Sequence, residues 1–259
     1  MNTRIVNADC LDSTTGIPSL PDFSVDMIIT SPPYDAIRDY HGFTLSLEDV
    51  GRECFRVLKD GGMMAMVIQD QTKDFGKSLT TFRTAVQFVD HIGFKLFESV
   101  IYERFGKPGA WWSKRFRVDH EYILLFLKGA KPKFFDKTTL MIPAIHAGKE
   151  WAGTQRLTNG SFIPIEKKTQ AAMKCRGTIW HYASSNSERD KLKLQHPATF
   201  PDKLVEDLIT CFTQEDNVIL DPFVGSGTTC VVAQRLKRNS IGFEISEEWA
   251  SLAERRINP

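Results

Sequence analysis

The chain has 259 residues, 42% of them hydrophobic and 25% charged, the balance of a globular protein with one large domain or a core domain carrying an insertion. No apolar run reaches the ~18 residues that cross a membrane, the first residues lack the apolar core of a signal peptide, and the formal net charge is only +1. Five widely spaced cysteines without a Cys-x-x-Cys pair argue against disulfides and against a zinc site, so a cytoplasmic protein without a metal is expected.

The first half of the chain alternates buried strand patterns with helix patterns. Ser46 is expected to cap the first helix, and Gly61 and Gly62 are expected to stop it. This rhythm predicts a sheet covered by helices. Strand patterns cover residues 25–29, 63–68, 94–102 and 121–127, and helix patterns cover residues 46–58 and 79–92.

A rigid polar tip, Ser31-Pro32-Pro33-Tyr34, follows the strand pattern of residues 25–29. In open α/β sheets the ligand crevice lies at the carboxyl ends of the strands. The Ser31 hydroxyl and the Pro32 carbonyl can accept hydrogen bonds from an amino group, and the ring of Tyr34 can stack on a flat guest. Taken alone, the tip is equally compatible with an ordinary loop.

The middle of the chain is basic. Residues 102–193 hold 18 Lys and Arg against 8 Asp and Glu, which leaves 15 against 24 for the rest. The aromatic, glycine-rich stretch 105–117 suits phosphates and bases, and its basic residues are the candidates for contacting them: Lys107, Lys114, Arg115 and Arg117. Residues 129–195 lose the strand–helix rhythm and are interpreted as an irregular insert. A solvated basic face remains the alternative.

Strand and helix patterns resume after His196-Pro197-Ala198-Thr199-Phe200-Pro201. Asp202 can cap a helix, and residues 218–220 are a strand pattern that runs into Asp221-Pro222-Phe223-Val224-Gly225-Ser226-Gly227-Thr228 and a further helix. Glycines in such a turn let a ligand lie on the backbone, and the helix N-terminus favours an anionic group. Glu244 ends the next strand, where a Rossmann-type unit places an acid for ribose hydroxyls.

These motifs, in this order, resemble the β-class of S-adenosylmethionine-dependent DNA amino-methyltransferases. In that family the Ser/Asp/Asn-Pro-Pro-Tyr motif comes first, a target-recognition insert follows, and the Phe-x-Gly-x-Gly cofactor motif comes last. The resemblance implies a Rossmann-like methyltransferase fold of class α/β: a mostly parallel twisted sheet with helices on both faces, plus an irregular target-recognition insert. The catalytic and cofactor-binding domain would comprise residues 1–128 and 196–259, and the insert residues 129–195.

The resemblance also implies residue roles. Ser31, Pro32, Pro33 and Tyr34 match the catalytic tetrapeptide, and His120-Glu121-Tyr122 resembles a strand that lines the target-base pocket. Glu244 matches the ribose acid, and Asp9, which could equally be a turn residue, matches a residue near the adenine. The segment that contains Phe200 resembles one that closes on the methionine end of the cofactor. The motif around that end is matched by Asp221, Phe223, Gly225, Ser226, Gly227 and Thr228.

The expected activity is methyl transfer from S-adenosylmethionine to the N4 amino group of a cytosine flipped out of duplex DNA. Ser at the first position of the tetrapeptide is typical of cytosine-N4 members of the family, and N6-adenine methylation is the alternative. A non-catalytic DNA-binding module and a methyltransferase acting on RNA or protein are disfavoured. The resemblance implies double-stranded DNA as the partner and leaves open a cognate restriction endonuclease and a homodimer.

Overall fold

The computed structural model describes residues 2–33, 46–104, 116, 118–182, 192–195, 199 and 201–258. Within these residues no helix is long and apolar enough to cross a membrane. The chain divides into two compact units, one formed by Met1–Asp136 with Thr178–Pro259 and the other by Lys137–Gly177.

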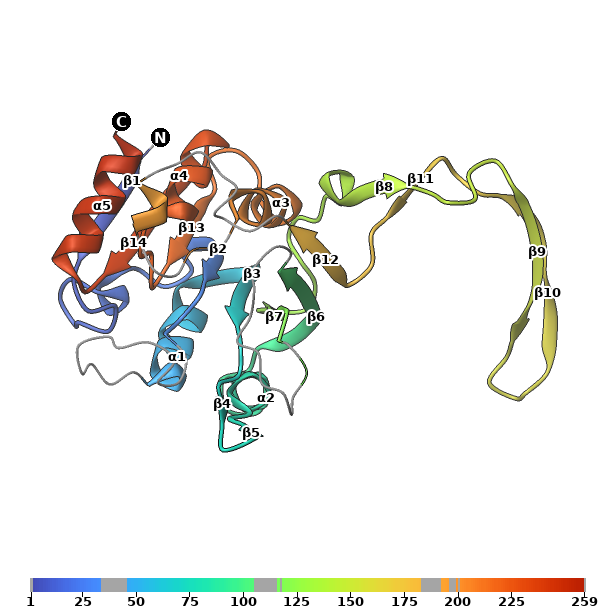
Figure 1. Cartoon of the computed structure of the whole chain (residues 1–259), viewed down its shortest axis with the longest axis horizontal. Coiled ribbons are helices and arrows are strands. Elements are labelled where there is room, and N and C mark those ends of the chain that lie inside the picture. Colours follow the sequence, from blue (N-terminus) through green and yellow to red (C-terminus); the bar gives the residue numbers. More distant parts are fainter. Residues whose placement is uncertain are drawn as a thin grey trace. The chain divides into compact units, whose positions relative to one another are not determined.

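An eight-stranded sheet forms the centre of the larger unit (Figure 1). Its strands pair in parallel except for β7, which runs antiparallel to both of its neighbours. Every residue of β2 is buried, as expected for a strand covered on both faces. In spatial order the strands are β1 (Thr3–Asn7), β14 (Asn239–Glu244), β13 (Val218–Asp221), β2 (Val25–Thr30), β3 (Leu58–Ile68), β7 (His120–Leu127), β6 (Lys95–Arg104) and β12 (Ile179–Tyr182).

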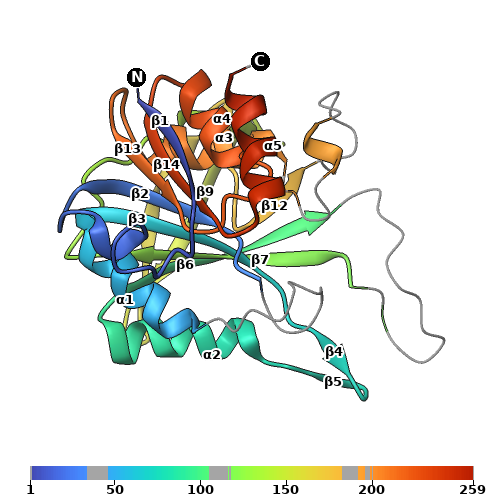
Figure 2. The same ribbon diagram turned by 90° about the vertical axis from the view of Figure 1, so that its left-hand side faces the viewer.

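Helices cover both faces of this sheet, which confirms the expected fold class (Figure 2). On one face lie α1 (Leu47–Val57), α2 (Thr80–Gln87) and the turn η2 (Phe88–Ile92); on the other lie α3 (Asp202–Phe212), α4 (Thr228–Arg235) and α5 (Glu247–Ile257). Under α1 and α2 the rings of Phe88, Phe94 and Phe126 pack together, with centroids 5.0–5.8 Å apart. Short elements complete this unit: η1 (Ile17–Ser19), β4 (Thr72–Lys73), β5 (Gly76–Lys77) and η5 (Lys193–Gln195).

The boundaries of α1 and β3 differ in part from the sequence prediction. Ser46 caps α1 as expected, because its hydroxyl accepts a bond from the Asp49 amide at 3.3 Å. The helix ends at Val57, however, and the two glycines that were expected to stop it lie inside β3. Tertiary pairing explains the difference, because the Gly61 amide donates to the Lys128 carbonyl at 2.8 Å and holds this stretch in the sheet.

The helix pattern of residues 79–92 forms a helix whose apolar stripe faces outward. Phe82 and Val86 are 51% and 59% exposed, whereas Thr81, Thr84 and Phe88 are buried. The spacing therefore predicts the helix but not the face that packs on the sheet. The buried residues of this stretch are instead Thr81 and Thr84 of α2 and Phe88, which belongs to the hydrophobic core.

The smaller unit consists of two-stranded pairs. The strands β8 (Met141–Pro143) and β11 (Met173–Cys175) pair antiparallel, as do β9 (Glu150–Arg156) and β10 (Phe162–Thr169), while the turn η3 (Thr138–Leu140) precedes β8. The unit lies within the expected insert of 129–195, and β12, also within those bounds, pairs with β6 in the main sheet. Trp180 and Tyr182 of β12 are buried, and the Tyr182 hydroxyl donates to Asp207 at 2.7 Å.

Candidate active site

The predicted site segments meet along one edge of the sheet. β1, β14, β13 and β2 are neighbours and run in parallel, so their carboxyl ends lie side by side. Asp9 follows β1, Glu244 ends β14, Asp221 ends β13, and Ser31 follows β2. Residues more than 200 positions apart in the chain therefore form one edge, and this is the edge where open α/β sheets bind their ligands.

The tip after β2 is held by two prolines. Thr30 is the last, fully buried residue of the strand, and Ser31, Pro32 and Pro33 follow outside regular structure. Pro32 is buried, whereas Ser31 and Pro33 are partly exposed. The two rings fix the backbone at this point, so the Ser31 hydroxyl and the Pro32 carbonyl are presented without the freedom of an ordinary loop.

Asp221 organises the turn between β13 and α4. Its carboxylate accepts a bond from the Thr229 hydroxyl at 2.6 Å and another from the Phe223 amide at 3.1 Å. The side chain is only 2% exposed, and this burial raises the pKa of Asp221 to about 6, although the two hydrogen bonds oppose the rise. Asp221 therefore holds the turn in shape from beneath instead of presenting its carboxylate to a ligand.

This turn, residues 222–228, is called the glycine turn. Two of its glycines have positive φ, Gly225 at 48° and Gly227 at 81°. A Cβ atom at Gly227 would lie 2.9 Å from the Ala253 Cβ and 3.1 Å from the Ala253 Cα. The missing side chain at this position therefore makes room for the helix α5, whereas the sequence suggested room for a ligand. Beyond the turn begins α4, and the first N–H groups of a helix have no acceptor within it, so they could donate to an anion.

Glu244 connects the glycine turn to the end of β14. One carboxylate oxygen accepts the Gly225 amide at 3.0 Å, and the other accepts the Ser246 amide at 2.9 Å. Burial raises the pKa of Glu244, and these two bonds oppose the rise. Each oxygen retains a second lone pair, so the carboxylate can still accept hydrogen bonds from the hydroxyl groups of a sugar.

Asp9 is exposed beside this acid, beyond the end of β1. One of its oxygens accepts a hydrogen bond from the Leu11 amide at 2.9 Å in a turn. The sequence offered this turn role as the alternative to a place near the adenine. β1 and β14 are in register from Thr3 to Asn7, and the Ala8 amide donates to the Glu244 carbonyl at 3.0 Å. The turn therefore lies next to the Glu244 strand end.

The antiparallel strand β7 begins at the same edge. His120 and Tyr122 lie on one face of β7 with ring centroids 5.3 Å apart, and Tyr122 also meets Phe82 of α2 at 5.7 Å. Glu121 points to the other face and forms an ion pair with Arg104 of β6. The start of β7 therefore adds aromatic rings and an ion pair to the carboxyl edge of the sheet, two strands away from β2 and its proline tip.

Six predicted site residues lie outside the described residues. These are Tyr34 of the tetrapeptide, Phe200, and the expected DNA-binding residues Lys107, Lys114, Arg115 and Arg117. One buried residue at the edge was missed from the sequence, Arg256 of α5, which contacts the glycine turn. Its position among Leu252, Ala253 and Ile257 is a signal, because a cation on the apolar face of a helix needs a specific partner.

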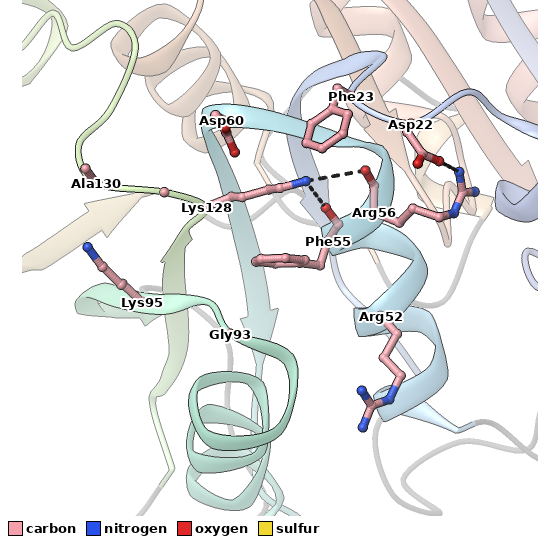
Figure 3. A pocket seen from close by; sticks show the side chains of 11 residues that line it. Asp22, Phe23, Arg52, Phe55, Arg56, Asp60, Gly93, Lys95, Lys128 and Ala130 are labelled. Carbon is pink, nitrogen blue, oxygen red and sulfur yellow. Dashed lines mark hydrogen bonds and ion pairs between the residues drawn. The ribbon is translucent and has the colours of Figure 1, made fainter.

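A cavity of about 710 Å³ lies at the opposite edge, where the strands of the larger unit begin. Figure 3 shows Lys128 extending between the rings of Phe23 and Phe55, whose centroids lie 4.0 and 4.7 Å from its ammonium nitrogen. Lys128 donates to the carbonyls of Phe55 and Leu58 at 2.6 and 2.7 Å. Arg56, on the same cavity wall, is paired with Asp22 and Glu53. These cations therefore stabilise the end of α1.

The described cysteines offer no nucleophile at the edge. Burial raises the pKa of Cys10 and Cys230 to about 12, and it also raises the pKa of Cys54. Such thiols remain protonated at neutral pH and react poorly. All five cysteines are free, and the described residues contain no cluster of acids, histidines and cysteines that could hold a metal ion.

Comparisons with known proteins agree with this geometry. A family model described as DNA methylase, N6_N4_Mtase, matches residues 25–255. The orphan methyltransferase M.BamHII of Bacillus amyloliquefaciens is 33% identical over 243 residues, which cover 92% of this chain and 91% of the relative.

Two solved structures share the fold. The cytosine-N4-specific PvuII DNA methyltransferase has a TM-score of 0.73 at 23% identity, covering 99% of this chain and 86% of the other. A putative DNA modification methylase of Thermus thermophilus, complexed with S-adenosyl-L-methionine, has a TM-score of 0.64 at 25% identity and covers 98% of this chain and 93% of the other.

Proposed function

Because the chain belongs to the DNA methylase family that matches residues 25–255, we propose that it methylates the N4 amino group of cytosine in double-stranded DNA. The chain is a DNA methyltransferase of the N6/N4 class, and its cofactor is S-adenosylmethionine. The observation that carries the proposal is the meeting of Ser31-Pro32-Pro33, the glycine turn and Glu244 on adjacent strand ends.

The residues present fit this cofactor. The free amides at the N-terminus of α4 suit the carboxylate of its methionine end, and the Glu244 carboxylate suits its ribose hydroxyls. S-adenosylmethionine supplies the methyl group as an electrophile at its sulfonium. The proposed assignments place Gly225, Ser226, Gly227 and Thr228 at the methionine end, with Asp221 and Phe223 supporting their turn and Asp9 near the adenine.

Ser31 and Pro32 would orient the target amino group. The Ser31 hydroxyl and the Pro32 carbonyl each accept one of its N–H groups, which directs the nitrogen lone pair toward the methyl group. The two prolines hold these acceptors in place before the substrate arrives, and such preorganisation lowers the barrier. An amino nitrogen needs no covalent intermediate with the protein, in agreement with the protonated thiols of Cys10, Cys54 and Cys230.

The choice of cytosine rests on Ser31. A neutral hydroxyl stands where adenine-N6 members of the family mostly carry Asp, and N6-adenine methylation remains the alternative product. Mass spectrometry of nucleosides from methylated DNA decides between them. We expect N4-methyldeoxycytidine; a product consisting of N6-methyldeoxyadenosine would contradict the cytosine assignment while leaving the methyltransferase class intact.

The same assay tests the role of Ser31. Ser31→Ala should lower the methyl-transfer rate about 100-fold, because one preorganised acceptor is lost. Its affinity for S-adenosylmethionine should stay within about twofold of the native value. Ser24→Ala is the matched control, since the Ser24 hydroxyl binds the Pro21 carbonyl in an exposed turn before β2. An unchanged rate in Ser31→Ala would remove Ser31 from the site.

We also propose that the basic stretch of residues 102–193, which includes the compact unit, binds the DNA. The compact unit of residues 137–177 carries 7 Lys and Arg against 2 Asp and Glu. The strands β9 and β10 form a two-stranded antiparallel ribbon, an element that a DNA major groove can admit. DNA affinity should fall with salt, and neutralising Lys114, Arg115 and Arg117 together should flatten that dependence. An unaltered slope would exclude these three residues from the phosphates. The proposal requires neither a restriction endonuclease nor a homodimer.

A further inference from the structure

Three consecutive residues of the glycine turn contact the C-terminal helix α5. Gly227, in the middle, closes on Ala253, where an added Cβ would lie 2.9 Å from the Ala253 Cβ. Its neighbours Ser226 and Thr228 are both bound by Arg256, one turn further along α5. The helix therefore packs against the middle residue of the turn and forms hydrogen bonds with the residues on both sides of it.

The Arg256 side chain makes the polar part of this contact. One guanidinium nitrogen, Nη1, donates to the Ser226 carbonyl and lies 3.4 Å from the Ser226 hydroxyl and 3.3 Å from the Thr228 hydroxyl. The residue is 7% exposed, and Ser226 and Thr228 are 3% exposed each. These bonds are shielded from water, so they are stronger than the same bonds on the surface.

The contact determines which way the Ser226 carbonyl points. Because this oxygen accepts from Arg256, it faces α5 and not the anion-binding end of α4. The next amide, that of Gly227, donates to the Val224 carbonyl at 2.8 Å and fixes the other side of the same peptide group. Rotation of this peptide would turn a carbonyl oxygen toward the cofactor's carboxylate, where two negative ends repel each other.

We propose that Arg256 is a positioning residue for the methionine end of the S-adenosylmethionine site. It holds the Ser226 carbonyl away from the cofactor's carboxylate, and its positive charge beneath the turn adds to the favourable potential of the α4 N-terminus. The adenosine half of the cofactor would be served by Glu244 of β14, whose carboxylate accepts the Gly225 and Ser246 amides, whereas Arg256 bonds Ser226 and Thr228. This inference rests on the assignment of the glycine turn to the methionine end.

Two ligands separate the halves of the site. S-adenosylhomocysteine and methylthioadenosine are both thioethers of the same nucleoside, and only the first carries the amino-acid group. Calorimetric titration of Arg256→Met should show about a tenfold or greater loss of affinity for S-adenosylhomocysteine, the effect of losing charged hydrogen bonds. Its affinity for methylthioadenosine should remain within about threefold of the native value. Arg256→Lys retains the charge and should recover part of the lost affinity.

The matched control is Arg255→Met, which removes an exposed arginine from the neighbouring position of the same helix. It should leave both affinities unchanged. Equal losses for the two ligands in Arg256→Met, or no loss, would overturn the proposal, because a merely structural residue would affect both halves alike. If Arg256→Met does not fold, Arg256→Lys is tested in its place. A larger loss of affinity for S-adenosylhomocysteine than for methylthioadenosine supports the proposal, and equal losses or no loss overturn it. A native chain that binds both ligands equally well would overturn the assignment of the turn itself, whereas the DNA product assay bears only on the target base.

Discussion

The main sheet has a carboxyl edge, where most of its strands end, and an amino edge, where they begin. Side chains of opposite charge bind the backbone groups at the two edges. At the carboxyl edge, Asp221 and Glu244 accept backbone N–H groups from the turns around them. At the amino edge, Lys128 and Arg56 donate to backbone carbonyls, including those of Leu58 and Leu20. The reason lies in helix direction, because a helix exposes carbonyls where it ends and N–H groups where it begins.

Among the described residues, this difference favours the carboxyl edge for an anionic ligand. At the amino edge the end of α1 is closed by Lys128, and Arg52 and Arg56 of the cavity are engaged by acids of the same helix. At the carboxyl edge the acids hold the turns from below, and the N-terminus of α4 keeps its N–H groups for a ligand. The cavity of about 710 Å³ therefore lies away from the edge where the predicted site segments meet.

The largest expected effect comes from adding one methyl group at each edge. Gly227→Ala should cost about 3 kcal/mol of unfolding free energy, because the new Cβ meets α5 in a positive-φ turn. Gly93→Ala should cost only about 1 kcal/mol, since its Cβ would meet nothing closer than Phe55 at 3.7 Å. Urea unfolding measures both. Equal costs would show that α5 does not press on the turn.

A smaller effect is expected from Lys128→Met at the amino edge. The substitution keeps the apolar stem between the two rings but leaves the carbonyls of Phe55 and Leu58 without their donor. We expect a loss of about 2 kcal/mol in urea unfolding, with cofactor affinity unchanged. Lys95→Met, an exposed lysine on the same cavity, should cost less than about 0.5 kcal/mol. A loss of cofactor affinity in Lys128→Met would contradict the separation of the two edges.

The smallest effect is a pH dependence at the carboxyl edge. Burial raises the pKa of Asp221 from 3.8 to about 6, so the folded chain binds a proton more tightly than the unfolded chain. This contribution to stability is fully present below pH 3.8 and is lost as the pH rises through 6. From pH 7.5 to pH 5, the native chain should gain about 1 kcal/mol relative to Asp221→Asn. A constant difference between the two proteins would show that Asp221 does not titrate in this range.

Much of the fold could be predicted from local patterns. The apolar runs before Ser31 and Asp221 predicted buried strands, and they form β2 and β13. The Ser46 cap and the spacing of the apolar residues predicted α1. The order of the proline tip and the glycine motif also indicated the methyltransferase class, because the resemblance depends on residue types along the chain.

Other features depend on what lies across the fold. The apolar stripe of α2 faces outward, and the glycines after α1 enter β3, because packing and strand pairing override local signals. Within the expected insert, β12 has only four residues, too few for periodicity to reveal a strand. Its pairing with β6 became evident only in the folded chain.

The sequence by itself determined which residues could form the glycine turn and its acid, since Gly225, Gly227 and Glu244 belong to a motif that can be recognised along the chain. Only the tertiary structure decided how that turn is held. Gly227 makes room for α5, and Arg256 binds the residues on either side, from positions about 30 residues away. Local spacing encodes backbone conformation, whereas contacts between distant segments arise from packing. The sequence therefore identifies Gly227 as a turn residue, but it does not identify the residue of α5 that packs against it.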